Sequence, residues 1–130
     1  MIKRFIDSDL FSKRWFRNLN AQEKVLWFCI TQTCTYDGFW EYDEEAIKFY
    51  CNGYDGEIPK VIEDKLEMIK VDEHQFFLKS WITFQYGKLR RNVRPHQRII
   101  NRLTDKQLDH LFPELAEDLV DTKTGEVLND

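Results

Sequence analysis

The spacing of apolar residues changes from a helical period to a strand period within residues 58–79, and this change restricts the possible folds more than any other feature. The helical part places five apolar residues on one face: Ile58, Val61, Ile62, Leu66 and Ile69. Residues 68–71 and 75–79 then have the composition of two strands, joined by the polar residues 72–74. A helix that leads directly into a β-hairpin predicts an α+β fold.

The preceding segment predicts two helices, a strand and a third helix. Asn20 followed by Glu23 matches a capping box, so we expect a helix over about residues 20–33. Because residues 25–30 are all apolar, that helix should be central and buried. A shorter helix should precede it, while residues 39–42 should form a strand beside the hairpin and residues 44–51 a brief helix.

The segment after the hairpin predicts a strand and two helices. Aromatic residues alternate over 81–86, as in a strand that continues to Gly87. Pro95 should open a helix to about Leu103, and Thr104 with Gln107 matches a second capping box for a helix to Phe112. Three helices closed by a β-hairpin form the winged helix-turn-helix plan, so we expect this α+β fold with additional C-terminal helices.

Length and composition fit one globular domain. The chain has 130 residues, 42% of them hydrophobic, which suffices for a single core, and its three cysteines are too few for a disulfide scaffold. We expect a winged-helix domain over 1–119, with a core at about 4–87 and a basic helical extension at 88–119, and then an acidic flexible tail at 120–130. Without a signal peptide or a membrane-length apolar run, the odd cysteine count favours the cytoplasm.

Charge is strongly segregated along the chain. The net charge of -4 argues against nucleic acid as a partner when it is taken as an average. Residues 1–36, 37–73, 74–104 and 105–130 carry net charges of +3, -8, +7 and -6, and residues 74–104 contain no acid at all. A DNA-binding surface is therefore compatible with the composition, provided that it lies in a basic block.

Five segments carry a family resemblance: RFIDSDLF at residues 4–11, WFRNL at 15–19, KVLW at 24–27, DGFWE at 37–41 and WITFQYG at 81–87. In order and spacing they resemble the N-terminal winged-helix domain of phage replisome-organiser and DnaD-like replication proteins. This resemblance implies a role in DNA replication. Such a module would bind or remodel DNA at an origin, self-associate, or recruit the helicase-loading machinery.

The usual recognition helix of a helix-turn-helix is acidic in this chain. It would be the helix over 58–69, whose solvent face would carry Glu57, Lys60, Glu63, Asp64 and Glu67. Because phosphates would repel this face, we expect DNA at the basic block after the wing instead. The predicted phosphate-contacting residues are Lys88, Arg90, Arg91, Arg94, Arg98 and Arg102.

A second, smaller basic patch could extend that surface: Lys3, Arg4, Lys13, Arg14 and Arg17. No catalytic or metal-binding motif is apparent, so we expect no enzymatic activity, cofactor, metal, membrane contact or small-molecule substrate. The expected partners are duplex or single-stranded DNA, together with further copies of the chain or replication proteins. Two alternatives stay open: an assembly module that oligomerises or recruits a helicase loader without binding DNA, and a winged-helix transcription regulator.

Overall fold

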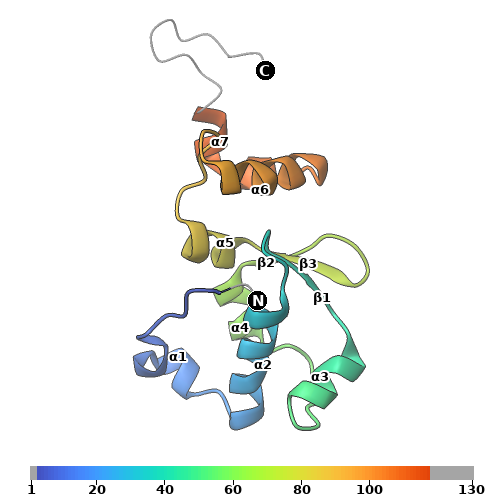
Figure 1. The fold of residues 1–130 in the computed structure, drawn as a ribbon. Coiled ribbons are helices and arrows are strands. Elements are labelled where there is room, and N and C mark those ends of the chain that lie inside the picture. The colour runs from blue at the N-terminus through green and yellow to red at the C-terminus, as the bar shows by residue number, and fades with distance from the viewer. Residues whose placement is uncertain (1–2, 118–130) are drawn as a thin grey trace, which may run out of the picture. The chain divides into compact units, whose positions relative to one another are not determined.

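The computed structural model describes residues 3–117, which belong to two compact units (Figure 1). Unit 1 spans residues 1–85 and unit 2 spans residues 86–130. The predicted acidic tail at 120–130 lies outside the described residues.

Unit 1 contains helices and one small sheet. Its elements are the 3₁₀ helix η1 (Leu10–Ser12), α1 (Arg14–Arg17), α2 (Ala21–Thr33), β1 (Phe39–Glu41), α3 (Glu44–Tyr50), α4 (Lys60–Leu66), β2 (Met68–Lys70), β3 (Gln75–Leu78) and α5 (Lys79–Tyr86), whose last residue falls in unit 2. Unit 2 continues with α6 (Arg94–Asp105), the 3₁₀ helix η2 (Asp109–Leu111) and α7 (Pro113–Glu117).

The sheet is three-stranded and antiparallel, with the strand order β1-β3-β2. Phe77 of β3 lies opposite Phe39 of β1 and Ile69 of β2. The Phe39 and Phe77 rings are 5.2 Å apart, and both side chains are buried. The predicted hairpin and its third strand are therefore confirmed, and the protein has an α+β fold.

Helix α2 begins as the sequence predicts but is less deeply buried. The Asn20 side chain accepts a hydrogen bond from the Glu23 amide, and the Glu23 carboxylate accepts one from the Asn20 amide, both at 2.8 Å. Leu26 and Ile30 are fully buried, whereas Val25 is 43% exposed. The expectation of a helix buried all round is wrong, because only one side of α2 packs on the core.

Residues 81–86 form helix α5, which corrects the predicted strand. Trp81 and Ile82 are buried while Thr83 and Phe84 are exposed, so burial does not alternate residue by residue along this segment. The Ser80 hydroxyl also donates to the Lys65 carbonyl at 2.6 Å, which fixes the start of α5 against α4. Aromatic and β-branched composition gave the wrong signal here because such preferences reflect packing more than backbone conformation.

Two helix boundaries also differ from the prediction. Helix α4 ends at Leu66, because Glu67 adopts a left-handed conformation with φ of 48° and β2 starts directly after it. Thr104 lies inside α6, where its hydroxyl donates to the Ile100 carbonyl at 3.0 Å, so the predicted second capping box is wrong. Gln107, at φ of 59°, instead follows the end of α6.

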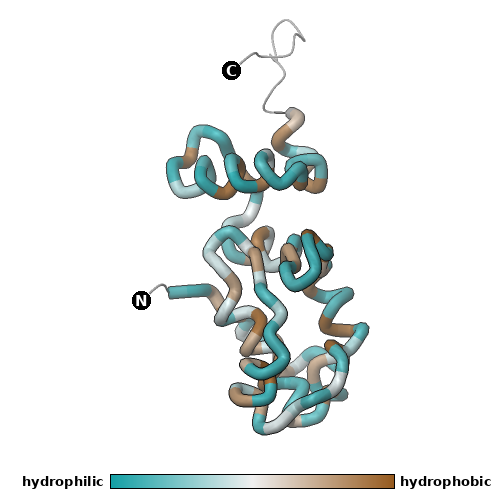
Figure 2. Tube along the Cα trace, turned by 90° about the vertical axis from the view of Figure 1, so that its right-hand side faces the viewer, coloured by the Kyte–Doolittle hydropathy of each residue, from teal (hydrophilic) through white to brown (hydrophobic). Residues whose placement is uncertain are grey.

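Unit 2 has an apolar core of its own. Its buried side chains come from the connecting loop, from α6, from the two residues that flank η2 and from α7: Leu89, Ile99, Ile100, Leu103, Leu108, Phe112 and Leu115. Figure 2 shows hydrophobic positions recurring between hydrophilic ones along these elements. Within residues 3–117, none of the helices combines the length and the apolar composition needed to cross a membrane.

Gly38 should be the glycine most sensitive to substitution. Its φ is +85°, and a Cβ atom there would lie 2.7 Å from Cγ1 of the fully buried Ile82. Gly53 has a similar φ of +82° with nothing within 4 Å. We therefore expect Gly38→Ala to lower the free energy of unfolding by about 2–4 kcal/mol and Gly53→Ala by about 1–2 kcal/mol, since only the first adds overpacking to backbone strain. Urea unfolding measures both, and equal losses would contradict the proposed contact.

Candidate nucleic-acid interface

Helix α6 separates apolar and basic residues onto different faces. Ile99, Ile100 and Leu103 are at most 2% exposed. Arg94, Arg98 and Arg102 are exposed and recur every four residues, which keeps them within an arc of roughly 80° on the helix surface. At a rise of about 1.5 Å per residue they extend over about 12 Å of the helix. The helix therefore presents a row of guanidinium groups.

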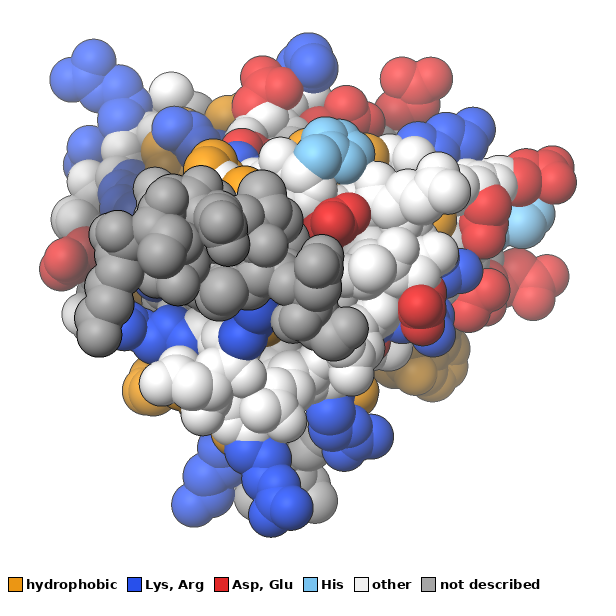
Figure 3. Space-filling view, turned by 90° about the horizontal axis from the view of Figure 1, so that it is seen from above, with side chains coloured by type: hydrophobic (Ala, Val, Ile, Leu, Met, Phe, Trp, Pro, Cys, Tyr) orange, Lys and Arg blue, Asp and Glu red, His pale blue; other side chains and the backbone are white. Residues whose placement is uncertain are grey.

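Hydrogen bonds connect the loop before α6 to that helix. Leu89 is fully buried, the Arg90 amide donates to Nδ1 of His96 at 3.0 Å, and Nε2 of Gln97 donates to the Arg91 carbonyl at 2.9 Å. These contacts hold the loop backbone while the side chains of Lys88 and Arg90 are exposed. The structure thus brings five of the six predicted basic residues onto the exposed surface of unit 2. In the space-filling view of Figure 3, Lys and Arg side chains project from the surface in several groups.

Arg91 differs from the other five. Its side chain is half-buried, and Nη2 donates to the carbonyl of Leu115 in α7 at 3.5 Å. Its Nε is buried without a hydrogen-bond partner. Arg91 therefore packs inside unit 2. This contact could not be predicted from the sequence, because α7 follows Arg91 by more than twenty residues.

Helix α4, which the sequence predicts as the acidic recognition helix, is short and carries no net charge, because Glu57 and Glu67 lie outside it and Lys60 and Lys65 balance Glu63 and Asp64. Its seven residues make about two turns, and Lys60 forms an ion pair with Asp64 at 3.0 Å. Asp64 and Glu67 are exposed, whereas Glu63 is half-buried. Lys65, the other lysine of α4, lies over the Trp15 ring, so α4 presents no row of cations like the one on α6.

The smaller basic patch is partly used within unit 1. The guanidinium of Arg4 donates to the carbonyls of Thr31 at 3.1 Å and Cys34 at 2.5 Å, and it lies 5.1 Å from the Trp81 ring centre. Lys13 forms an ion pair with Asp7 at 2.5 Å, which together with the Asp9 amide lowers the pKa of that carboxyl. The other members, Lys3, Arg14 and Arg17, are exposed.

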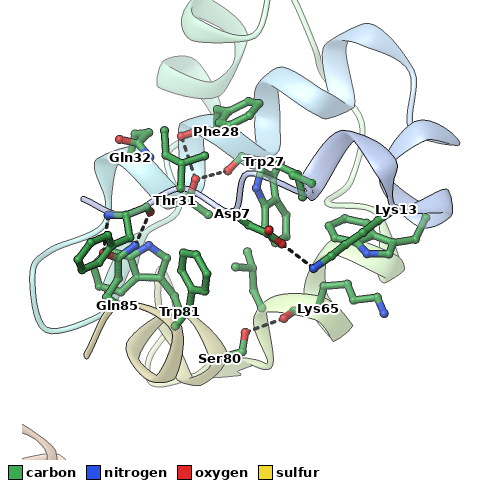
Figure 4. Close-up of a pocket in the computed structure, with 16 residues that line it drawn as sticks. Asp7, Lys13, Trp27, Phe28, Thr31, Gln32, Lys65, Ser80, Trp81 and Gln85 are labelled. Atoms are coloured by element: carbon green, nitrogen blue, oxygen red, sulfur yellow. Dashed lines mark hydrogen bonds and ion pairs between the residues drawn. The ribbon is translucent and has the colours of Figure 1, made fainter. Parts of the chain in front are cut away.

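Sequence reasoning did not find a cavity in unit 1. It has a volume of about 410 Å³ and lies between the N-terminal segment, α2, the end of α4 and α5 (Figure 4). Trp27 and Phe28, which the sequence assigned to the core, are half-buried and line this cavity. The signal in the sequence that could have indicated a cavity was the aromatic content of 15%, because the chain contains more aromatic side chains than its buried positions hold.

Comparison of the chain with protein-family models, with curated proteins and with solved structures gave no match. Within residues 3–117 there is also no group of three or more His, Cys, Asp or Glu side chains placed to hold a metal ion.

His96 should make the loop before α6 sensitive to pH. Burial, with a smaller contribution from the charge of Arg90, lowers the pKa of His96 below its usual value of 6.5. The neutral ring accepts the Arg90 amide through Nδ1. Because the unfolded chain takes up a proton near pH 6.5 and the folded chain only at lower pH, stability is full above pH 6.5 and falls as the pH drops below it.

We therefore expect the His96 ring to titrate below pH 6.5 in NMR spectra, and the Arg90 amide resonance to follow the same curve. His96→Asn keeps an acceptor for that amide and removes the titration, so it should abolish the Arg90 response. Titration of His96 at or above pH 6.5 would contradict the buried neutral ring.

Proposed function

We propose that this protein is a DNA-binding winged-helix module and that unit 2 contacts the phosphate backbone through α6. The residues that carry the contact are the three arginines on the exposed face of α6, with Lys88 and Arg90 of the preceding loop. The observation that supports it most directly is the exposed row of Arg94, Arg98 and Arg102 on a helix whose opposite face is buried.

Guanidinium groups suit this task for a geometric reason. The planar fork of an arginine can donate two parallel hydrogen bonds to phosphate oxygens, which a lysine ammonium cannot do with the same directionality. An arginine row on a rigid helix also needs little ordering when it binds, because the backbone positions are fixed by Ile99, Ile100 and Leu103 in the core of unit 2. Residues 74–104 contain no acid that would repel the phosphates.

Unit 1 supports the winged-helix part of the proposal. Its β2–β3 hairpin follows α4 directly, as a wing follows the recognition helix, and β1 adds the third strand. The replication context rests on the resemblance of residues 4–41 and 81–87 to replisome-organiser proteins. A transcription regulator is less well supported, because α4 has only seven residues and its Lys60 is paired with Asp64, which leaves few cations for a major groove.

Replacing Arg94, Arg98 and Arg102 together with Ala should weaken DNA binding and reduce its salt dependence. Five phosphate contacts on duplex DNA predict a slope of log K against log salt of about -4.5, and removal of three should bring the slope to about -1.8. Fluorescence anisotropy with duplex and single-stranded oligonucleotides at several salt concentrations measures both quantities.

The matched control removes the same charge from unit 1 through Lys3→Ala, Arg14→Ala and Arg17→Ala, all at exposed positions. This variant should leave the slope near that of the unmodified chain. If the control lowers the slope and the α6 variant does not, DNA lies on the smaller patch. If the unmodified chain binds neither form of DNA, the proposed function is wrong.

A further inference from the structure

The cavity of unit 1 is suited to aromatic side chains. Its walls include the rings of Trp15, Trp27, Phe28, Trp81 and Phe84. Several apolar groups around it are far more exposed than a finished core requires: Phe5 is 70%, Ile6 61% and Phe84 49% exposed. A volume of about 410 Å³ lies within the range of pockets that hold ring-containing ligands. A cavity with this lining gains free energy when an apolar group enters it.

One end of the cavity carries a net charge of +1, from Lys13, Lys65 and the Asp7 carboxylate that pairs with Lys13. Figure 4 shows Lys13 and Lys65 together at one end and Gln32 and Gln85 at the other. Gln85 is engaged, because its side chain exchanges two hydrogen bonds with the Phe5 backbone, at 2.9 and 2.8 Å. The ammonium of Lys65 lies 5.6 Å from the Trp15 ring centre and is exposed. A suitable partner would therefore insert an aromatic side chain into the cavity and carry carboxylates close to that side chain, where they would face the lysines.

Unit 1 also carries an aromatic projection of that kind. Phe49 and Tyr50, at the end of α3, are 82% and 60% exposed, and their rings stack edge to face at 5.4 Å. We call this pair the knob. Residues 43–57 around it hold five acids and one lysine, whereas residues 3–17 beside the cavity hold five Lys or Arg and two Asp. The knob and the cavity are therefore complementary both in apolar character and in charge.

The knob cannot fill the cavity of its own chain. Helix α3 lies on one side of α2 in Figure 1, and α1, beside the cavity, lies on the other. A contact between knob and cavity must therefore join two chains. A single knob-in-cavity contact joins two different surfaces, so repeated contacts build a head-to-tail assembly in which one end chain keeps an unused knob and the other an unused cavity.

We propose that the cavity of unit 1 binds the Phe49–Tyr50 knob of a second copy of this chain, so that copies associate head-to-tail. This inference is independent of DNA binding by unit 2. The apolar rings supply most of the affinity, and the lysines at the cavity's end with the acids around the knob set the orientation.

Variants of the knob and of the cavity test this directly by sedimentation velocity. The unmodified chain should form species that grow with protein concentration. Phe49→Ala with Tyr50→Ala should weaken this association by at least about 10-fold. Lys65→Glu with Phe84→Ala, which changes only the cavity, should have the same effect. Val25→Ala removes an exposed apolar group of α2 outside the cavity and should associate like the unmodified chain.

A mixture of the two variants gives the sharpest result. Each variant alone lacks one half of every contact, but the cavity variant keeps a knob and the knob variant keeps a cavity. An equimolar mixture should therefore form a 1:1 dimer and no larger species. Gln32→Trp, which adds a ring at an exposed lining position, serves as a second cavity variant if circular dichroism shows that Lys65→Glu with Phe84→Ala is unfolded.

Three outcomes would overturn the proposal. The first is an unmodified chain that stays monomeric at all concentrations, which would leave the cavity to a different partner. The second is association that persists unchanged in the knob variant. The third is a mixture that contains monomers only, although both variants are folded.

Discussion

Burial of β3 between two antiparallel neighbours is the constraint on which the rest of unit 1 depends. Phe77 and Leu78 are fully buried, and the Leu78 amide donates to the Gly38 carbonyl at 2.8 Å. The chain leaves β3 directly into α5, whose Ile82 packs against Gly38. The position of β3 thus sets where α5 begins, and α5 in turn supplies Trp81 and Phe84 to the cavity.

Segregated charge has different consequences in the two units. In unit 1, two of the five basic residues at 3–17, Arg4 and Lys13, take part in internal contacts. In unit 2, an amphipathic helix turns its arginines outward because its apolar residues supply the core. A net charge of -4 therefore says little about partners, since phosphate binding depends on local charge within a Debye length of about 10 Å.

The two proposals would reinforce each other if both hold. Head-to-tail association through unit 1 would place several copies of α6 within reach of one DNA molecule. Once one copy is bound, its neighbours in the assembly would be at a high effective concentration near the same DNA. The weak phosphate contacts of the single copies would then combine into tighter overall binding. Such an arrangement gives strong but salt-sensitive binding without base reading, which suits a chain whose α4 carries carboxylates.

The sequence by itself determined the local structure wherever the deciding interactions join residues that are close together in the chain. The Asn20 capping box, the hairpin and the two faces of α6 follow from side-chain chemistry and periodicity within a few residues. Tertiary structure decided the rest. Residues 81–86 form a helix that packs Trp81 and Ile82 into the core, Arg91 turns toward α7, and Phe28 lines a cavity that distant segments enclose. Each of these outcomes depends on contacts between residues far apart in the chain, and such contacts leave no periodic signal in the sequence.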